Sequence, residues 1–151
     1  MTTIIDGVDG FAELVGKELG YSEWQPITQE RVNLFADATG DHQWIHVDPE
    51  RAKTGPFGGA IAHGYLTLSL APTMLGEVLT VEGMKFGVNY GCNKVRFPSP
   101  VPVGADLRMG VTVAAVDDTD GGVQVTYDLV MEVKEAPKPA CVAQVVYRYY
   151  R

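Results

Sequence analysis

The most apolar stretch of the sequence runs from Ala60 to Leu79 and reads AIAHGYLTLSLAPTMLGEVL. Its apolar residues recur at helical spacing, so we predict a long central helix that is apolar nearly all round. One predicted face consists of Ile61, Tyr65, Leu68, Pro72 and Leu75, and it is widened by Leu66, Leu70 and Met74. Pro72 removes an internal hydrogen bond and should kink the helix. Polar residues inside the stretch, including His63 and Glu77, indicate a buried helix and argue against a membrane span.

From Gly87 onward the apolar residues recur with a period of two. They alternate with polar residues over 107–115 and 123–133, and another strand is predicted over Cys141 to Tyr150. The sequence DDTDGG at 117–122 is typical of a turn between the first two of these segments. The pattern predicts long, half-buried strands in an antiparallel meander.

Only the segment 60–79 is apolar and long enough to cover such a sheet. We therefore predict an α+β fold in which an antiparallel sheet wraps around one long central α-helix. The edge strand of the sheet has unpaired backbone N–H and C=O groups that can bond to a second copy of the chain, so we expect a homodimer. A chain of 151 residues is long enough for one hydrophobic core, so residues 1–151 should form a single domain.

Composition excludes several classes of function. Hydrophobic residues make up 46% of the chain and charged residues 21%, which is typical of a globular protein. The formal net charge of −7 argues against a nucleic-acid or anionic-membrane partner, because both need a basic surface. Cys92 and Cys141 are too few for a disulfide framework, and the first residues do not resemble a secretory signal. We expect a cytoplasmic protein.

The candidate catalytic residues follow a predicted helix over about 29–39. Thr28 can cap this helix and Gly40 can end it, so Asp41 should begin an exposed loop that extends to Val47. A short helix over Pro49 to Lys53, capped by Asp48, should follow. The loop contains Asp41 and His46. Their carboxylate and imidazole can hold one water molecule between them by hydrogen bonds.

Structural, non-catalytic interpretations of these residues are also open. Asp41 can be an ordinary turn residue after a glycine, and His46 can be a packed loop histidine. A metal site built from Asp41, His42, His46 and His63 is conceivable, but loop spacing does not fix the ligands on a common face as a helix would. We therefore expect no metal.

A second candidate feature is the run from Phe57 to Tyr65, FGGAIAHGY, which leads into the central helix. The first amides of a helix have no partner within it and carry partial positive charge. The amide of Gly64 could therefore stabilise negative charge on a carbonyl oxygen, an effect worth about 3 kcal/mol per donor.

Taken together, these residues resemble the signature of the MaoC-like dehydratase, or hydratase 2, family of (R)-specific enoyl-CoA hydratases. The matching positions are Phe35, Thr39, Gly40, Asp41, Ile45, His46 and Ala52. The runs 58–64 and 93–104 also resemble the family, so the likeness covers roughly Thr28 to Tyr150.

This resemblance implies a hot-dog fold, a dimer and the reversible syn addition of water to a trans-2-enoyl-CoA, giving the (R)-3-hydroxyacyl-CoA. Asp41 would take a proton from the water, while His46 would orient that water and help deliver a proton to the α-carbon. The Gly64 amide would hold the enolate-like oxygen. The implied substrate is an acyl-CoA thioester, and no metal or redox cofactor is needed.

The chain departs from the family pattern at three places, the first of which is Ala38, where members usually carry an aliphatic residue or glycine. Gln43-Trp44 replaces the usual Asn-Pro, so that Trp44 can narrow the pocket or stack on substrate. Pro72 stands where some members have a serine that orients the catalytic aspartate, and Asn89 and Asn93 are candidate replacements. Cations that could meet the phosphates of CoA are Lys85, Lys94 and Arg96.

Two alternative functions remain open. Hot-dog proteins include acyl-CoA thioesterases, which do not need the Gly-Asp to His spacing. The chain could also be a subunit of a heterodimeric 3-hydroxyacyl thioester dehydratase. Such a subunit can lose the acid/base pair, and this chain keeps both residues.

Overall fold

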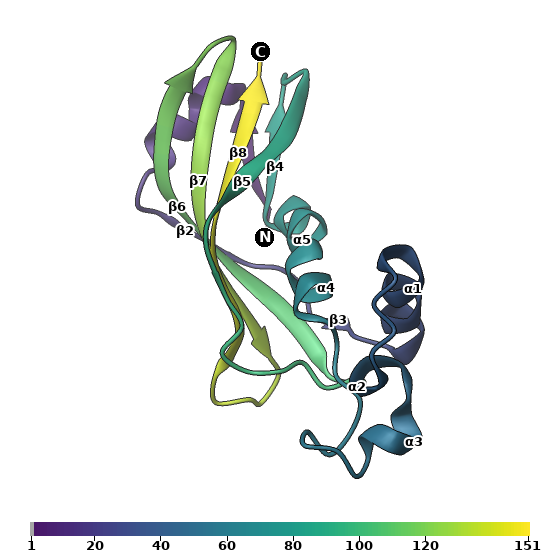
Figure 1. The fold of residues 1–151 in the computed structure, drawn as a ribbon. Helices are drawn as coiled ribbons and strands as arrows, with labels where there is room; N and C mark the ends of the chain where they lie inside the picture. The colour runs from purple at the N-terminus through teal and green to yellow at the C-terminus, as the bar shows by residue number, and fades with distance from the viewer. Residues whose placement is uncertain (1) are drawn as a thin grey trace.

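The computed structural model describes residues 2–151 and contains a six-stranded antiparallel sheet beside a pair of helices (Figure 1). The strand order is β2-β6-β7-β8-β5, and the two-residue strand β3 also pairs with β6. The strands of this sheet are β2 (Glu18–Tyr21), β3 (Gln25–Pro26), β5 (Phe86–Arg96), β6 (Asp106–Thr119), β7 (Gly122–Val133) and β8 (Pro139–Tyr150). The predicted α+β arrangement of a sheet against a helix is confirmed.

The meander prediction is correct for β6, β7 and β8, which follow one another as antiparallel neighbours. The strand β5 lies outside this predicted meander; it pairs with β8 and so lies at the edge of the sheet. The segment 97–105 between β5 and β6 contains three prolines and cannot form a tight hairpin, because proline donates no backbone hydrogen bond and restricts the residue before it.

The predicted central helix is broken into α4 (Gly64–Ser69) and α5 (Ala71–Val78). The break lies at Leu70, just before Pro72, whose ring would collide with the preceding turn of a continuous helix. The helical pair is also shorter than predicted. The segment 60–63 is not helical, and Leu79 begins β4 (Leu79–Glu82), which pairs in parallel with β1 (Thr3–Asp6).

The buried face of the helical pair agrees with the predicted one in part. Tyr65 is 73% exposed and Pro72 is exposed as well. The helical residues packed in the core are Leu66, Leu70, Ala71, Met74, Leu75 and Val78. Leu66, Leu70, Met74 and Leu75 belong to the predicted face, whereas Tyr65 and Pro72 were predicted on it and are exposed.

The sheet face is covered by more than the segment 60–79. A 3₁₀-helix, η1 (Val8–Leu14), places Phe11 against the sheet, where its ring stacks on Tyr149 with centroids 4.9 Å apart. Phe11 is fully buried. Because η1 buries only Val8 and Phe11, its apolar signal in the sequence is too short to recognise.

The remaining helices carry the candidate residues. The helix α1 (Gln29–Thr39) has both predicted ends: the Thr28 hydroxyl accepts from the Arg31 amide, and Gly40 is left-handed with φ 82°. Asp48 caps α3 (Pro49–Ala52) as predicted. The predicted loop up to Val47 is wrong in its second half, which forms the helical turn α2 (Trp44–Val47). In Figure 1, α1 to α3 lie on the other side of α4 and α5 from the sheet.

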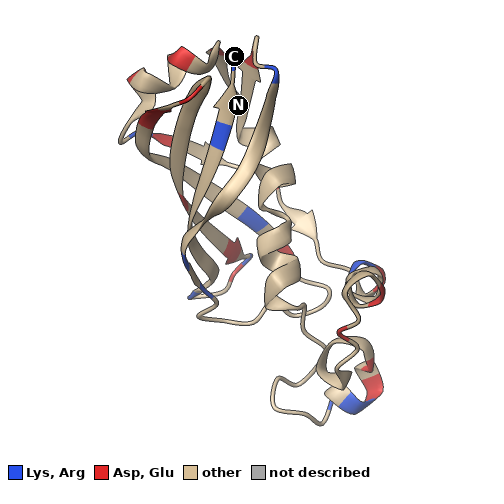
Figure 2. Cartoon of the chain, turned by 45° about the horizontal axis from the view of Figure 1, so that its top comes forward, with Lys and Arg blue, Asp and Glu red and all other residues tan. Residues whose placement is uncertain are grey.

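Within residues 2–151, no helix is both long and apolar enough to cross a membrane. Figure 2 shows Lys and Arg residues scattered among Asp and Glu residues over the strands and helices.

Candidate active site

Asp41 lies at the end of α1, where the left-handed Gly40 turns the chain. Its carboxylate accepts a hydrogen bond from the Gln43 amide at 3.3 Å, and the residue is exposed. This short bond back to the loop keeps the carboxylate close to α2, which carries His46.

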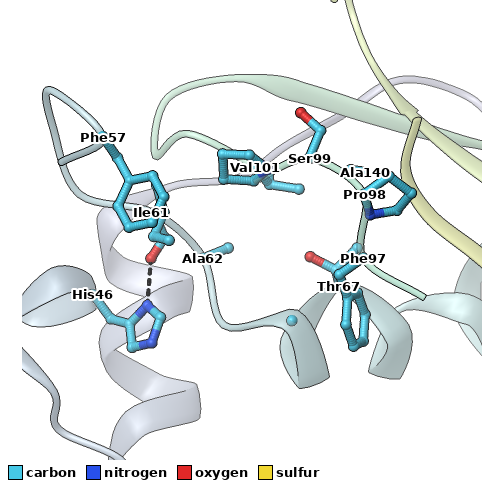
Figure 3. Close-up of a pocket in the computed structure, with 12 residues that line it drawn as sticks. His46, Phe57, Ile61, Ala62, Thr67, Phe97, Pro98, Ser99, Val101 and Ala140 are labelled. Atoms are coloured by element: carbon cyan, nitrogen blue, oxygen red, sulfur yellow. Dashed lines mark hydrogen bonds between the residues drawn. The ribbon is translucent and has the colours of Figure 1, made fainter. Parts of the chain in front are cut away.

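His46 is buried, with only 6% of its surface exposed. Its Nδ1 lies 2.7 Å from the carbonyl oxygen of Ile61 (Figure 3). A carbonyl only accepts, so Nδ1 carries the hydrogen and the uncharged ring has its lone pair on Nε2. Burial lowers the pKa of His46 below its ordinary value, because it disfavours the charged ring. The second nitrogen is therefore available as a hydrogen-bond acceptor.

The structure brings Asp41 and His46 together, with His63 beside them. One carboxylate oxygen of Asp41 and one ring nitrogen from each histidine lie within 4.8 Å of one another. Two hydrogen bonds of about 2.8 Å each would span such a distance, so one water molecule fits between the carboxylate and the His46 imidazole.

His63 contacts both residues. Its Nε2 lies 3.0 Å from the main-chain oxygen of Asp41, and its ring stacks on the His46 ring with centroids 3.9 Å apart. The sequence predicts that His63 packs or forms a hydrogen bond at the entry to the helix, close to the proposed chemistry. Its place in the cluster needed the tertiary structure, because Asp41 and His63 are 22 positions apart.

The donor atoms of Asp41, His46 and His63 are close enough to hold a metal ion together. His42, the fourth ligand considered from the sequence, lies outside this cluster. Its Nε2 is 2.9 Å from the Asp37 carboxylate, and that bond raises the pKa of His42. The four-residue metal site is therefore not formed. That the protein needs no metal stays a prediction.

A cavity of about 420 Å³ opens beside His46. Its lining includes His46, Phe57, Gly64, Thr67, Phe97 and Val101, and Figure 3 shows His46 on one side with Thr67 and Phe97 on the other. Sequence reasoning gave no site role to Phe57, Thr67, Phe97 or Val101. Of these, only Phe97 and Val101 had a signal, since both lie in a run that resembles the family.

Gly64 is the first residue of α4, so its amide has no partner within the helix. A Cβ at this position would lie 3.2 Å from the Phe97 ring, which is closer than ordinary contact. Glycine is therefore needed for the close packing of Phe97 beside the helix start. Gly64 and His46 face the same cavity.

Other residues considered from the sequence lie elsewhere. Trp44 does not line the cavity. Its ring packs against Gly55, and the central carbon of the Arg51 guanidinium lies 4.3 Å from the centroid of the ring. The amide of Asn93 donates to Gln144 at the exposed edge of the sheet. Arg96 is exposed and precedes Phe97, so it lies next to the cavity wall.

Residues 10–134 match the family described as the MaoC like domain. The chain is 54% identical over 145 residues to 3-hydroxyacyl-thioester dehydratase Z of Mycobacterium tuberculosis, which covers 95% of this chain and 96% of that protein.

Among solved structures, the fold is similar to the (R)-hydratase from A. caviae involved in PHA biosynthesis. The two structures have a TM-score of 0.73 and 26% sequence identity, and the match covers 88% of this chain and 94% of the (R)-hydratase chain. The R-hydratase PhaJ1 from Pseudomonas aeruginosa has a TM-score of 0.70 and 27% identity over 91% of this chain and 83% of the other. The predicted hot-dog fold is confirmed.

Proposed function

The chain belongs to the MaoC-like dehydratase family, and we propose that it is an (R)-specific enoyl-CoA hydratase. It would add water reversibly to a trans-2-enoyl-CoA and give the (R)-3-hydroxyacyl-CoA. The observation that carries this proposal is the approach of the Asp41 carboxylate to the His46 imidazole within 4.8 Å, beside a cavity that also holds Gly64. The similarity to a 3-hydroxyacyl-thioester dehydratase and to two R-hydratases supports it.

In this mechanism Asp41 and His46 both act first as acceptors toward the water. The ionised carboxylate can only accept, and the Ile61 bond leaves His46 with a lone pair on Nε2. A water molecule held through its two hydrogens turns its oxygen lone pairs away from both residues. That oxygen can then attack the β-carbon of an enoyl thioester lying in the cavity.

The proton transfers balance within the pair. As the new C–O bond forms, Asp41 takes one proton from the water, and the electrons of the C=C bond move toward the thioester oxygen. The protonated Asp41 then returns its proton to the new hydroxyl oxygen while the hydroxyl hydrogen passes to Nε2 of His46, and Nε2 donates that proton to the α-carbon. Both new bonds form on the face of the substrate that the pair occupies, so the addition is syn.

The Gly64 amide would donate to the thioester oxygen while negative charge develops there. A preorganised donor of this kind is worth about 3 kcal/mol in the transition state. The acyl chain would then lie in the cavity along α4, against Thr67 and Phe97. Arg96, which is exposed and precedes Phe97 of the cavity lining, would bind a phosphate of coenzyme A.

We also propose that the whole chain is one MaoC-like hot-dog domain that works as a homodimer in the cytoplasm. One hydrophobic cluster includes residues from Ile5 to Tyr149, which supports a single domain. The edge strand β5 exposes Phe86, Val88 and Tyr90 by 44% to 59%, and a second copy would cover them. Both cysteines are free, which fits a reducing compartment.

The direct test is to incubate the purified protein with crotonyl-CoA and follow the loss of the enoyl absorbance. We expect hydration to the (R)-hydroxyacyl product, identified by chiral analysis. A free thiol released in place of a hydroxyacyl thioester would identify a thioesterase. Activity that needs a second, different polypeptide would identify a subunit of a heterodimer. No reaction with enoyl-CoA of any chain length would overturn the proposal.

A further inference from the structure

His63 is fixed at the junction between the candidate pair and α4. It is 3% exposed and immediately precedes Gly64. Its Nε2 donates to the main-chain oxygen of Asp41 at 3.0 Å, because a carbonyl can only accept. The Thr67 hydroxyl donates to the carbonyl of His63 at 3.4 Å, which ties His63 to the next turn of the helix.

The His63 ring also supports the ring of His46. The two rings stack at 25°, with centroids 3.9 Å apart, and Phe35 of α1 lies against His63 at 4.9 Å. His46 is thus held at one edge by the Ile61 carbonyl and on one face by His63. These contacts leave the imidazole little freedom to tilt.

The other nitrogen of His63 indicates that the ring is not present for stability alone. Among the described residues, Nδ1 is a buried nitrogen with no hydrogen-bond partner. Leaving such an atom unpaired costs about 1–3 kcal/mol, which an apolar side chain of similar size would avoid. A cost of this kind is expected at functional sites.

We infer that His63 is a positioning residue that sets the separation of the Asp41 carboxylate and the His46 imidazole. This inference rests on the proposed hydratase function. His63 anchors the main chain of Asp41 through Nε2 and the plane of His46 through its ring face. It would take the role for which some family members use a serine at the position of Pro72, but from the N-terminal end of α4.

Two substitutions separate the two contacts. His63→Gln keeps an amide N–H near the position of Nε2 but loses the ring, whereas His63→Phe keeps a ring and loses the donor. His42→Gln is the matched control, because His42 is exposed and bonds only to Asp37. The assay is hydration of crotonyl-CoA by the whole protein, with circular dichroism and thermal melting of each variant.

We expect each His63 variant to lose about 10- to 100-fold in kcat, because a small misplacement of reacting groups has effects of this size. KM should stay within about twofold, since His63 does not line the cavity that receives the substrate. The His42→Gln protein should match the wild type.

The pH profile supplies a second readout. The groups that face His46 are the Asp41 carboxylate, the Ile61 carbonyl and His63, and the His63 ring lowers the pKa of His46. Both His63 variants should therefore move the acid limb of kcat/KM to higher pH. A residue that supported the fold without acting on His46 would not move it.

The outcomes are distinct. An active wild type with impaired, folded His63 variants and a shifted acid limb supports the inference. Full activity in both folded variants overturns it while leaving the hydratase function intact, and so does loss of activity only because both variants fail to fold. An inactive wild type overturns the hydratase proposal itself.

Discussion

Nδ1 of His46 donates to the carbonyl oxygen of Ile61 at 2.7 Å, and the amide of Ile61 donates to the carbonyl of Ile45 at 3.0 Å. The helical turn α2 is thus bonded twice to the segment that leads into α4. Gln29 of α1 adds a third tie, since its side chain donates to the His46 carbonyl at 2.8 Å. These bonds hold three separate pieces of chain in one arrangement around the candidate water site.

The first prediction concerns the pair itself. Asp41→Asn removes the proton acceptor and His46→Gln removes the titratable ring, so each should lower kcat about 100- to 10,000-fold. Steady-state hydration kinetics measure the loss. Asp37→Asn is the control, because Asp37 is an exposed acid bonded only to His42. Wild-type rates from either Asp41→Asn or His46→Gln would place the chemistry elsewhere.

The second prediction is the pH dependence. Burial lowers the pKa of His46 from its ordinary value of 6.5, so the uncharged ring persists below that pH. The rate constant kcat/KM should therefore stay level as the pH falls through 6.5 and decline only at lower pH. An acid limb at or above pH 6.5 in a buffer series would contradict this.

The lowered pKa of His46 also makes the free energy of unfolding depend on pH. Between the lowered pKa of folded His46 and 6.5, the unfolded chain binds more protons than the folded one. The free energy of unfolding should therefore decrease as the pH falls below 6.5. Urea unfolding of the wild type and of His46→Gln measures the difference, and the variant should show the smaller decrease.

A third prediction tests the amide of Gly64 by comparing two substitutions. Gly64→Ala adds a Cβ near Phe97 and keeps the N–H, whereas Gly64→Pro adds the same carbon and removes the N–H. Proline suits the first helical position, and His63 before it already has φ −61° and ψ 140°. The proline variant should lose about 100- to 1,000-fold more kcat than the alanine variant. Equal losses would show that the amide does not contribute.

Oligomeric state is the subject of the fourth prediction. Val88→Glu places a charge on the exposed edge strand β5 and should weaken the homodimer about 100-fold or more, because an unpaired buried carboxylate costs about 3 kcal/mol or more. Val130→Glu on β7 is the matched control, since Val130 is 40% exposed and Val88 is 44% exposed. Light scattering after size exclusion measures the mass. A monomeric wild type would exclude the dimer.

The fifth prediction concerns metals. Although Asp41, His46 and His63 could together bind an ion, the proposed steps use only their acid/base properties. Dialysis against EDTA should leave kcat unchanged, and elemental analysis should find no stoichiometric metal in active protein. Activity lost with chelator and restored by Zn²⁺ would assign the cluster to a metal.

Some parts of this fold were readable from local sequence alone. Thr28 and Gly40 fix the two ends of α1 because a hydroxyl cap and a left-handed glycine each act within one helical turn. The strand β6 was equally clear, since its apolar and polar residues alternate from Asp106 to Val113 and this alternation specifies both the strand and its buried face. Asp41, His46 and Gly64 were selected by residue type and spacing.

Tertiary structure decided the rest. The sequence could not show that β5 would pair with β8 or that η1 would cover part of the sheet. It also could not show that His63 would lie against His46. Each of these features depends on contacts between residues distant in the chain, whose free energy is absent from any local pattern and exists only once the sheet, the helical pair and α1 have packed together.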